Sequence, residues 1–473
     1  MLDLEAVIDE LVAIGPRYTA SPAHRRFESL LADGFRAAGA EVFTDDYLVP
    51  SWDPDDVQLE IEASEGRYRP VTVASVYPHS GTTDPAGVIG RLIDLGALSS
   101  VDLRNADLRG CVALITYPPL REPLPYPSIW GLAHGDDEPA PREWGMGSQH
   151  WLAIEKLRQQ LLGMGAVGLI VGWQELGPGP AAGQYQPILP PSVRKLYGEA
   201  NPELAALRDE SHGGVPAVWV DRAVRAQLST AARAAQRVRL VLTTAPEVPR
   251  PTSTIVAELP GSTDDAIVLV THTDGVNVIQ ENGPLALVAL ASRLARERPA
   301  VRRHCMIFIA ATAHFCRTVL DRDGVMSIAE SEGVLTRHPE IGRRAVAAVG
   351  IEHLGSLEVE DGGDDWALTG RPEWTHCVTE HAGLAAQALQ AIRSSGSGPT
   401  IVASGRVWGL AFPFQGVGVP TLSYGCAPGY LMSEASDGHR RFWSRERMER
   451  ELDALTTLIA SIDRSPPARL PRP

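Results

Sequence analysis

The sequence predicts an α/β fold, a mainly parallel mixed sheet that helices cover on both faces. Three observations carry this prediction. From residue 254 onward, short apolar runs typical of buried strands alternate with helical patterns, which favours a sheet buried on both sides. The chain of 473 residues is too long for one ordinary core, so we expect two domains or one domain with a large insert. Before residue 254 the pattern differs, because short β-like runs separated by Pro and Gly turns replace the alternation of strands and helices. The apolar runs are 255–259, 266–271, 305–311, 345–351 and 419–424, and the helical patterns are 284–296, 379–393 and 444–463.

The first half of the chain divides where the sequence pattern changes. Residues 1–52 read as helix, turn, helix and strand, with a break at Gly15-Pro16-Arg17. From residue 53 to about residue 245, short β-like runs are separated by Pro and Gly turns. We therefore expect a β-rich insert with lid loops over 61–248, between an N-terminal part of the main domain (1–60) and the main α/β domain (249–473).

Composition narrows the functional class. The net charge of −15 argues against a general nucleic-acid binder and against contact with an anionic membrane. No apolar run is long enough to span a bilayer, and the N-terminus has no signal-peptide pattern. The five cysteines are odd in number and scattered, which predicts reduced, mostly buried thiols. We expect a cytoplasmic protein.

Ionisable residues follow three successive apolar runs. His272 and Asp274 follow the first, His314 follows the second, and Glu352-His353 follows the third. Parallel strands place their carboxyl ends along one edge of a sheet, where ligands of open α/β folds bind. Glu281, in the loop after His272, belongs to the same edge. Imidazole and carboxylate together suit zinc or a similar divalent ion, so we expect a shared cation there.

The order of these residues resembles the zinc aminopeptidase and glutamate-carboxypeptidase-type exopeptidases. The resemblance rests on His272-Thr273-Asp274, on Glu281-Asn282-Gly283 before a helix, on the polar residues after the next strand, and on Glu352 shortly before a glycine. Further parts of the chain are similar to the same family. They are Gly15-Pro16-Arg17 with Ser21-Pro22, residues 86–240 (like the protease-associated domain that many members carry), and Phe412-Pro413-Phe414 with Gly418-Val419-Pro420.

The resemblance implies a site residue by residue. Members hold two zinc ions about 3.5–4 Å apart. His272 matches the first ligand, and Asp274 matches the carboxylate that orients this histidine. Glu281 stands at the bridging carboxylate, with Asn282 beside it in a supporting role. Two further ligand positions hold His314 and Glu352.

Two family residues are missing. Ala313 stands where the family has its general-base Glu, and no His occurs near residues 430–432, where a late ligand is expected; His439 comes too late. We therefore expect one ion, zinc or another divalent metal, with His272, Glu281, His314 and Glu352 as ligands. His353, Glu281 and His314 are the candidate catalytic groups.

Three functions fit these residues. The first is a metal-dependent hydrolase that cleaves an amide bond in a peptide or an amino-acid-like small molecule, with His353 or Glu281 as base. The second is a binding module that has lost catalysis. The third is metal-free acid/base chemistry by His314, Glu352 and His353. The expected partner is a small molecule or short peptide, and a homodimer is possible.

A group of late aromatic residues has two interpretations. Either these side chains line a substrate pocket, or they pack in the core. The group is Trp408, Phe412, Phe414, Tyr424 and Tyr430.

Overall fold

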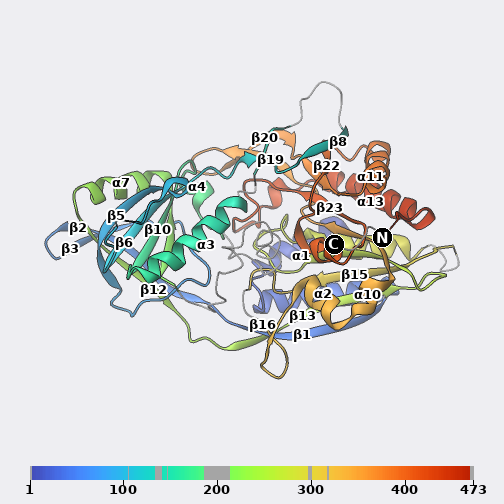
Figure 1. Cartoon of the computed structure of the whole chain (residues 1–473), viewed down its shortest axis with the longest axis horizontal. Helices are drawn as coiled ribbons and strands as arrows, with labels where there is room; N and C mark the ends of the chain where they lie inside the picture. The colour runs from blue at the N-terminus through green and yellow to red at the C-terminus, as the bar shows by residue number, and fades with distance from the viewer. Residues whose placement is uncertain are drawn as a thin grey trace.

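The fold has two lobes, each built around its own sheet (Figure 1). A computed structural model describes residues 3–104, 106–133, 141–145, 148–185, 214–296, 301–316 and 319–468. The larger lobe holds an 11-stranded sheet of order β17-β16-β1-β13-β15-β14-β18-β23-β21-β22-β8. The smaller lobe holds an 8-stranded sheet of order β3-β2-β12-β5-β6-β10-β11-β4.

The centre of the large sheet is parallel and its flanks are mostly antiparallel. Neighbours β15 and β14, β14 and β18, and β18 and β23 pair in parallel. On one side β13 and β1 continue the sheet antiparallel, and on the other side β21 does so. The strands are β1 (Glu41–Pro50), β8 (Ser128–Ala133), β13 (Pro249–Leu259), β14 (Ala266–His272), β15 (Cys305–Ala311), β16 (Val319–Leu320), β17 (Met326–Ser327), β18 (Ala345–Ile351), β21 (Thr375–Val378), β22 (Thr400–Ser404) and β23 (Thr421–Cys426).

Both faces of this sheet are buried, as the continuous apolar runs predict. Ile267 and Leu269 of β14 pack into one apolar cluster, and Val268 and Val270 pack into another on the opposite face. The first cluster joins the sheet to α1 (Leu4–Ile14), α2 (Pro22–Ala37), α8 (Asn282–Leu294), α11 (Ala382–Ser395) and α13 (Arg445–Arg464). The second joins it to α9 (Glu330–Arg337), α10 (Pro339–Arg344) and α12 (Phe412–Gly416). The predicted mixed α/β class is confirmed.

The smaller lobe is β-rich. Its strands are β2 (Pro54–Ser64), β3 (Arg67–Val71), β4 (Ser75–Val76), β5 (Val88–Ala97), β6 (Cys111–Tyr117), β10 (Gly168–Trp173), β11 (Ala217–Val220) and β12 (Arg237–Thr244), and its helices include α3 (Ser148–Gly163) and α7 (Arg222–Arg233). This sheet begins at Pro54, seven residues before the boundary expected from sequence. One segment of the expected insert lies elsewhere, because β8 pairs with β22 at the edge of the large sheet.

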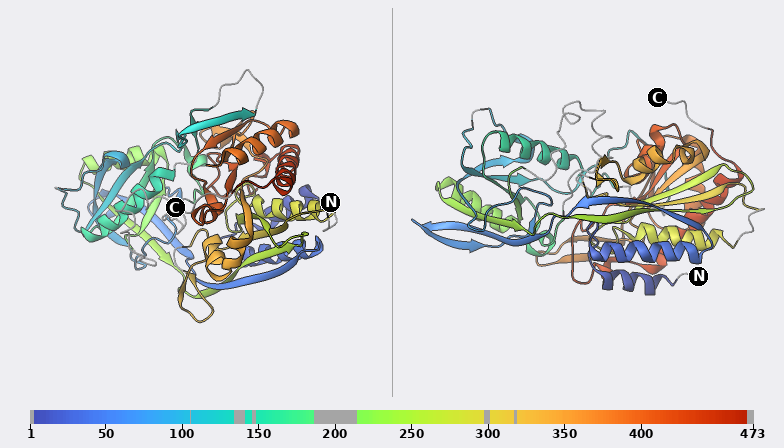
Figure 2. Two further views of the ribbon diagram at one scale, coloured as in Figure 1. Left: turned by 45° about the vertical axis from the view of Figure 1, so that its right-hand side comes forward. Right: turned by 90° about the horizontal axis from the view of Figure 1, so that it is seen from below.

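Two long antiparallel strands lead from one lobe to the other. β1 and β13 pair from Glu41 with Glu258 to Pro50 with Pro249, and the chain enters and leaves the smaller sheet just beyond this end (Figure 2). Other short elements among the described residues include β7 (Glu122–Pro123), β9 (Glu143–Trp144), α4 (Pro178–Ala181), β19 (Leu357–Asp361) and β20 (Trp366–Pro372).

All five cysteines are buried and free, which confirms the expectation of buried thiols. Among the helices that the structure describes, none combines the length and the apolar character needed to cross a bilayer.

Candidate metal centre

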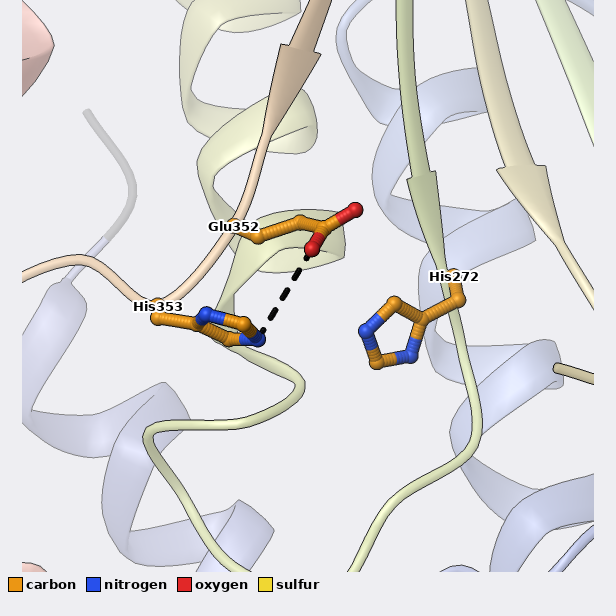
Figure 3. Close-up of side chains that lie close together, drawn as sticks. All are labelled: His272, Glu352 and His353. Atoms are coloured by element: carbon orange, nitrogen blue, oxygen red, sulfur yellow. Dashed lines mark ion pairs between the residues drawn. The ribbon is translucent and has the colours of Figure 1, made fainter. Parts of the chain in front are cut away.

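Three side chains converge at the carboxyl ends of two neighbouring parallel strands (Figure 3). His272 is the last residue of β14, and Glu352 and His353 follow β18 directly. Each offers one ligand atom, and these atoms lie within 4.8 Å of one another. All three residues are at most 4% exposed. The strand pairing explains the meeting, because β14 and β18 are parallel and end at the same edge.

Backbone carbonyls orient both histidines. The Nδ1 of His272 is 2.8 Å from the carbonyl oxygen of Asp274, and the Nδ1 of His353 is 2.7 Å from that of Cys426. A carbonyl oxygen only accepts, so each Nδ1 carries the proton and each Nε2 carries a lone pair. The Nε2 of His353 lies 3.8 Å from Oε2 of Glu352. Hydrogen bonds from Nδ1 to backbone carbonyls, like these two, fix the tautomer of metal-binding imidazoles in proteins.

Burial keeps these imidazoles neutral. It lowers the pKa of His272 to about 4, an effect that the neighbouring His314 strengthens. Burial likewise lowers the pKa of His353 to about 4. Two nitrogen lone pairs and a carboxylate therefore face one another away from water, which is unfavourable unless a cation or a proton lies between them. Two imidazoles and one carboxylate form a donor set that fits zinc.

His314 stands beside this group. Its ring stacks on that of His272 with centroids 4.5 Å apart and an interplanar angle of 20°. Its Nδ1 lies 2.7 Å from Oε1 of Glu330, at the start of α9. Burial lowers the pKa of His314, but the bond to Glu330 and the negative charges nearby outweigh it, so the pKa is raised. The structure thus places His314 next to the three converging side chains, in a pair with Glu330.

Glu281 is held by an arginine. The Nε of Arg17 donates to Oε2 of Glu281 at 3.0 Å, and Nη2 of Arg17 forms an ion pair with the same oxygen. Both side chains are at most 1% exposed, and Arg17 also donates to the carbonyl of Asn277 at 2.9 Å. Burial raises the pKa of Glu281 to about 7, against the opposing effect of Arg17. Glu281, expected from sequence to be a ligand and a base, is therefore not among the converging side chains.

Asp274 and Asn282 hold the loops around the centre by hydrogen bonds that involve backbone groups. The carbonyl of Asp274, rather than its carboxylate, holds His272. The carboxylate accepts from the backbone N–H groups of His314 at 3.2 Å and Phe315 at 3.1 Å. Asn282 clamps the loop after β18, because its side chain donates to the carbonyl of Leu354 at 2.6 Å and accepts from the N–H of Leu354 at 2.8 Å. The loops that carry His314 and His353 are thereby fixed relative to β14.

Positive φ angles gather at the same place. Ala313, Glu330 and His353 have φ of 66°, 55° and 60°, values that side chains with a Cβ seldom adopt. Strained residues of this kind concentrate at functional sites. Gly409, with φ of +67°, packs so closely on the Glu352 carboxylate that a Cβ there would overlap it.

Sequence reasoning missed several of these residues. The sequence pattern places Arg17 in a turn, and its only further signal is that Gly15-Pro16-Arg17 belongs to the family resemblance. Glu330 gave no signal, because nothing local links it to His314. Thr19, whose hydroxyl donates to the Asp274 carboxylate, gave none either.

Most of the late aromatic residues pack in the core, and one contacts a side chain of the site. Trp408 stacks on His353, with centroids 6.3 Å apart and an interplanar angle of 9°. Phe414, Tyr424 and Tyr430 are at most 1% exposed and belong to the core. His439 bonds to Ser433, with Nε2 2.7 Å from Oγ, and takes no part in the group around His272.

Comparison with solved structures agrees with this architecture. The chain matches the "peptidase M28 precursor" of Shewanella amazonensis SB2B with a TM-score of 0.64, 14% identity and coverage of 99% of this chain and 96% of that one. The fold is that of the zinc aminopeptidases. A zinc aminopeptidase from Bacillus subtilis matches with a TM-score of 0.62, 13% identity and coverage of 96% of this chain and 93% of that one. An aminopeptidase from Aneurinibacillus sp. strain AM-1 matches with a TM-score of 0.60, 14% identity and coverage of 99% of this chain and 94% of that one. No protein-family model and no curated protein matches the sequence.

Proposed function

We propose that this chain is a metal-dependent hydrolase of the exopeptidase type, with one divalent ion held by His272, Glu352 and His353. The observation that carries the proposal is that three buried lone-pair donors converge, with both imidazole Nδ1 atoms engaged by carbonyls. Zinc fits this donor set best. The proposed substrate is an amide of a peptide or of an amino-acid-like small molecule.

The ion, when bound, would polarise a substrate carbonyl and lower the pKa of a water molecule. The chain's own residues have separate tasks. His314 stacks beside His272 and its Nδ1 bonds to Glu330, which supports a role for its Nε2 as the acceptor of a proton from water. It would replace the base that Ala313 cannot supply. The Arg17–Glu281 pair and Asn282 hold the surrounding loops in place.

Metal analysis tests the ligand set. We expect about one zinc per chain in the purified wild type, and its loss in His272→Ala and in Glu352→Gln. Glu281→Gln is the matched variant, since it alters a nearby buried carboxylate that pairs with Arg17, and it should retain the metal. Loss of metal in Glu281→Gln would instead indicate that Glu281 is a ligand, as the sequence predicts. No metal in the wild type, even after zinc or manganese is added back, would remove the proposal.

Activity tests the reaction. A panel of aminoacyl amides and acyl-amino-acid amides should yield a substrate whose hydrolysis stops when a chelator removes the metal. His314→Gln should lower the turnover of that substrate while the metal content stays unchanged. A protein that binds metal but hydrolyses none of the panel would favour the binding module instead.

One geometric feature favours a second candidate, metal-free acid/base chemistry. The Nδ1 of His314 lies 2.7 Å from Oε1 of Glu330, close enough to share a proton, and the ring of His314 stacks on that of His272 beside Glu352 and His353. This function predicts activity that survives chelation and is lost in His314→Gln and Glu352→Gln alike.

A further inference from the structure

A cavity of about 160 Å³ lies at the junction of the two lobes, apart from the residues that converge on His272. Its wall comes from residues 120–121, 141 and 143–145, from the turn after β10, from the β19–β20 hairpin, and from residues near β21 and β23. A cavity of about 150 Å³ in a protein core is large enough to hold benzene. The space therefore suits a ligand of about six non-hydrogen atoms.

The wall of this cavity is strongly acidic. Six carboxylates contribute to it, and Arg121 is the single cationic side chain among the described residues that line it. Two of the six are paired with residues outside the wall, Asp361 with Arg222 at 3.0 Å and Glu358 with Arg371 at 2.6 Å. Burial raises the pKa of a third carboxyl, that of Glu373, to about 7, and this side chain accepts a hydrogen bond from the backbone N–H of Trp374 at 3.2 Å. Glu143, Glu175 and Glu360 still outnumber Arg121, so the potential in the cavity is negative and favours a cation. The carboxylates are those of Glu143, Glu175, Glu358, Glu360, Asp361 and Glu373.

The same wall holds three tryptophans, Trp144, Trp366 and Trp374, each at most 8% exposed. Two of them are fixed in place. Trp144 donates from Nε1 to Glu122 at 2.9 Å, and the ring of Trp366 packs on Gly429, where a Cβ would come within 3.1 Å of it. Rigid indole faces attract organic cations through their π electrons.

A buried histidine supplies an independent sign of a missing partner. His376 lines the cavity, is 2% exposed, and packs edge-on against Trp144 with ring centroids 5.6 Å apart. Its Nδ1 has no hydrogen-bond partner among the described residues. A buried polar atom left without a partner costs free energy, and such atoms in native proteins call for an explanation.

From these observations we propose that the cavity binds a small organic ammonium ion. The ammonium group would lie between the carboxylates of the wall and the indole faces, and its alkyl part would contact Leu120, Leu176 and Val359, which also line the space. Such a site goes beyond the proposed hydrolase centre and does not depend on it. Because its wall takes residues from both lobes, an occupant would stabilise their junction.

Titration of the full chain with n-butylammonium chloride, followed by tryptophan fluorescence and calorimetry, tests the site. We expect saturable binding about tenfold tighter than that of n-butanol, and none for sodium butyrate at equal ionic strength. Glu360→Gln and Glu373→Gln should each weaken binding about threefold or more. Glu340→Gln, an exposed change in α10, is the matched control and should bind as the wild type does.

The outcomes separate this site from the metal centre. His272→Ala should bind n-butylammonium as the wild type does, and its failure to do so would place the ligand at the metal centre and overturn the proposal. Equal binding of n-butanol would overturn it too, as would unchanged affinity in both Glu360→Gln and Glu373→Gln. A response to calcium chloride that matches the response to n-butylammonium would show a general cation site and would also contradict it.

Discussion

Replacing Arg17 by methionine should destabilise the protein strongly. The guanidinium is 1% exposed and its partner Glu281 is fully buried, so the substitution leaves a carboxylate without its counter-charge in the core. Breaking a buried pair from one side costs about 3–5 kcal/mol. The carbonyls of Leu11 and Asn277 also lose a donor, at 3.2 Å and 2.9 Å, which favours the upper part of this range.

Urea denaturation followed by circular dichroism measures this loss as a lower midpoint at an unchanged slope. Arg36→Met is the matched control. Arg36 pairs with Asp33 on the surface of α2, with side chains 57% and 78% exposed, and such a pair contributes less than about 1 kcal/mol. The double variant Arg17→Met/Glu281→Gln should recover part of the loss, with a coupling of about 1–3 kcal/mol. A loss below about 1 kcal/mol in Arg17→Met, or additive effects in the double variant, would refute the reasoning.

Three further predictions concern the centre and its surroundings. Gly409→Ala should lower the metal content and the stability, because its Cβ would overlap the Glu352 carboxylate and its φ is +67°; Gly363→Ala, with φ of +89° and open space around it, should keep the metal, as measured by elemental analysis. Asn282→Ala should cost about 1–3 kcal/mol in urea denaturation, since two buried hydrogen bonds to the loop after β18 are lost; a change within error would contradict the clamp. Burial lowers the pKa of His376 to about 4, so the unfolded chain binds this proton more readily and stability falls as the pH drops from about 6.5 towards 4. Between pH 7 and pH 5 this amounts to about 2 kcal/mol, and His376→Leu should show a correspondingly smaller loss over that interval if the histidine is its source.

The secondary structure of the large lobe could be predicted closely. The runs 266–271, 305–311 and 345–351 became β14, β15 and β18 with boundaries within one residue. Strands buried on both faces need continuous apolar sequence, and that requirement is local. The antiparallel flanks could not be predicted in the same way, because an apolar run does not specify the direction of its neighbour. The pairing of β8 with β22 joins segments that no pattern in the sequence connects.

The candidate site was predicted in part. The convergence of strand ends brought His272, Glu352 and His353 together, as the parallel order of β14 and β18 requires. The direction in which each side chain points is a different matter, because it depends on contacts outside the strand. Glu281 turns to Arg17, a residue 264 positions away. His314 turns to Glu330, whose position is set by α9.

By itself the sequence determined which segments form buried strands and which polar residues stand at their ends. Those properties follow from local apolar patterning and from the common edge that parallel strands share. Only the tertiary structure decided that Glu281 pairs with Arg17, that the carbonyl of Asp274 orients His272, and that a cavity lined by acidic and aromatic residues opens between the lobes. Buried charges and polar groups must find partners wherever the fold supplies them, and those partners come from distant parts of the chain.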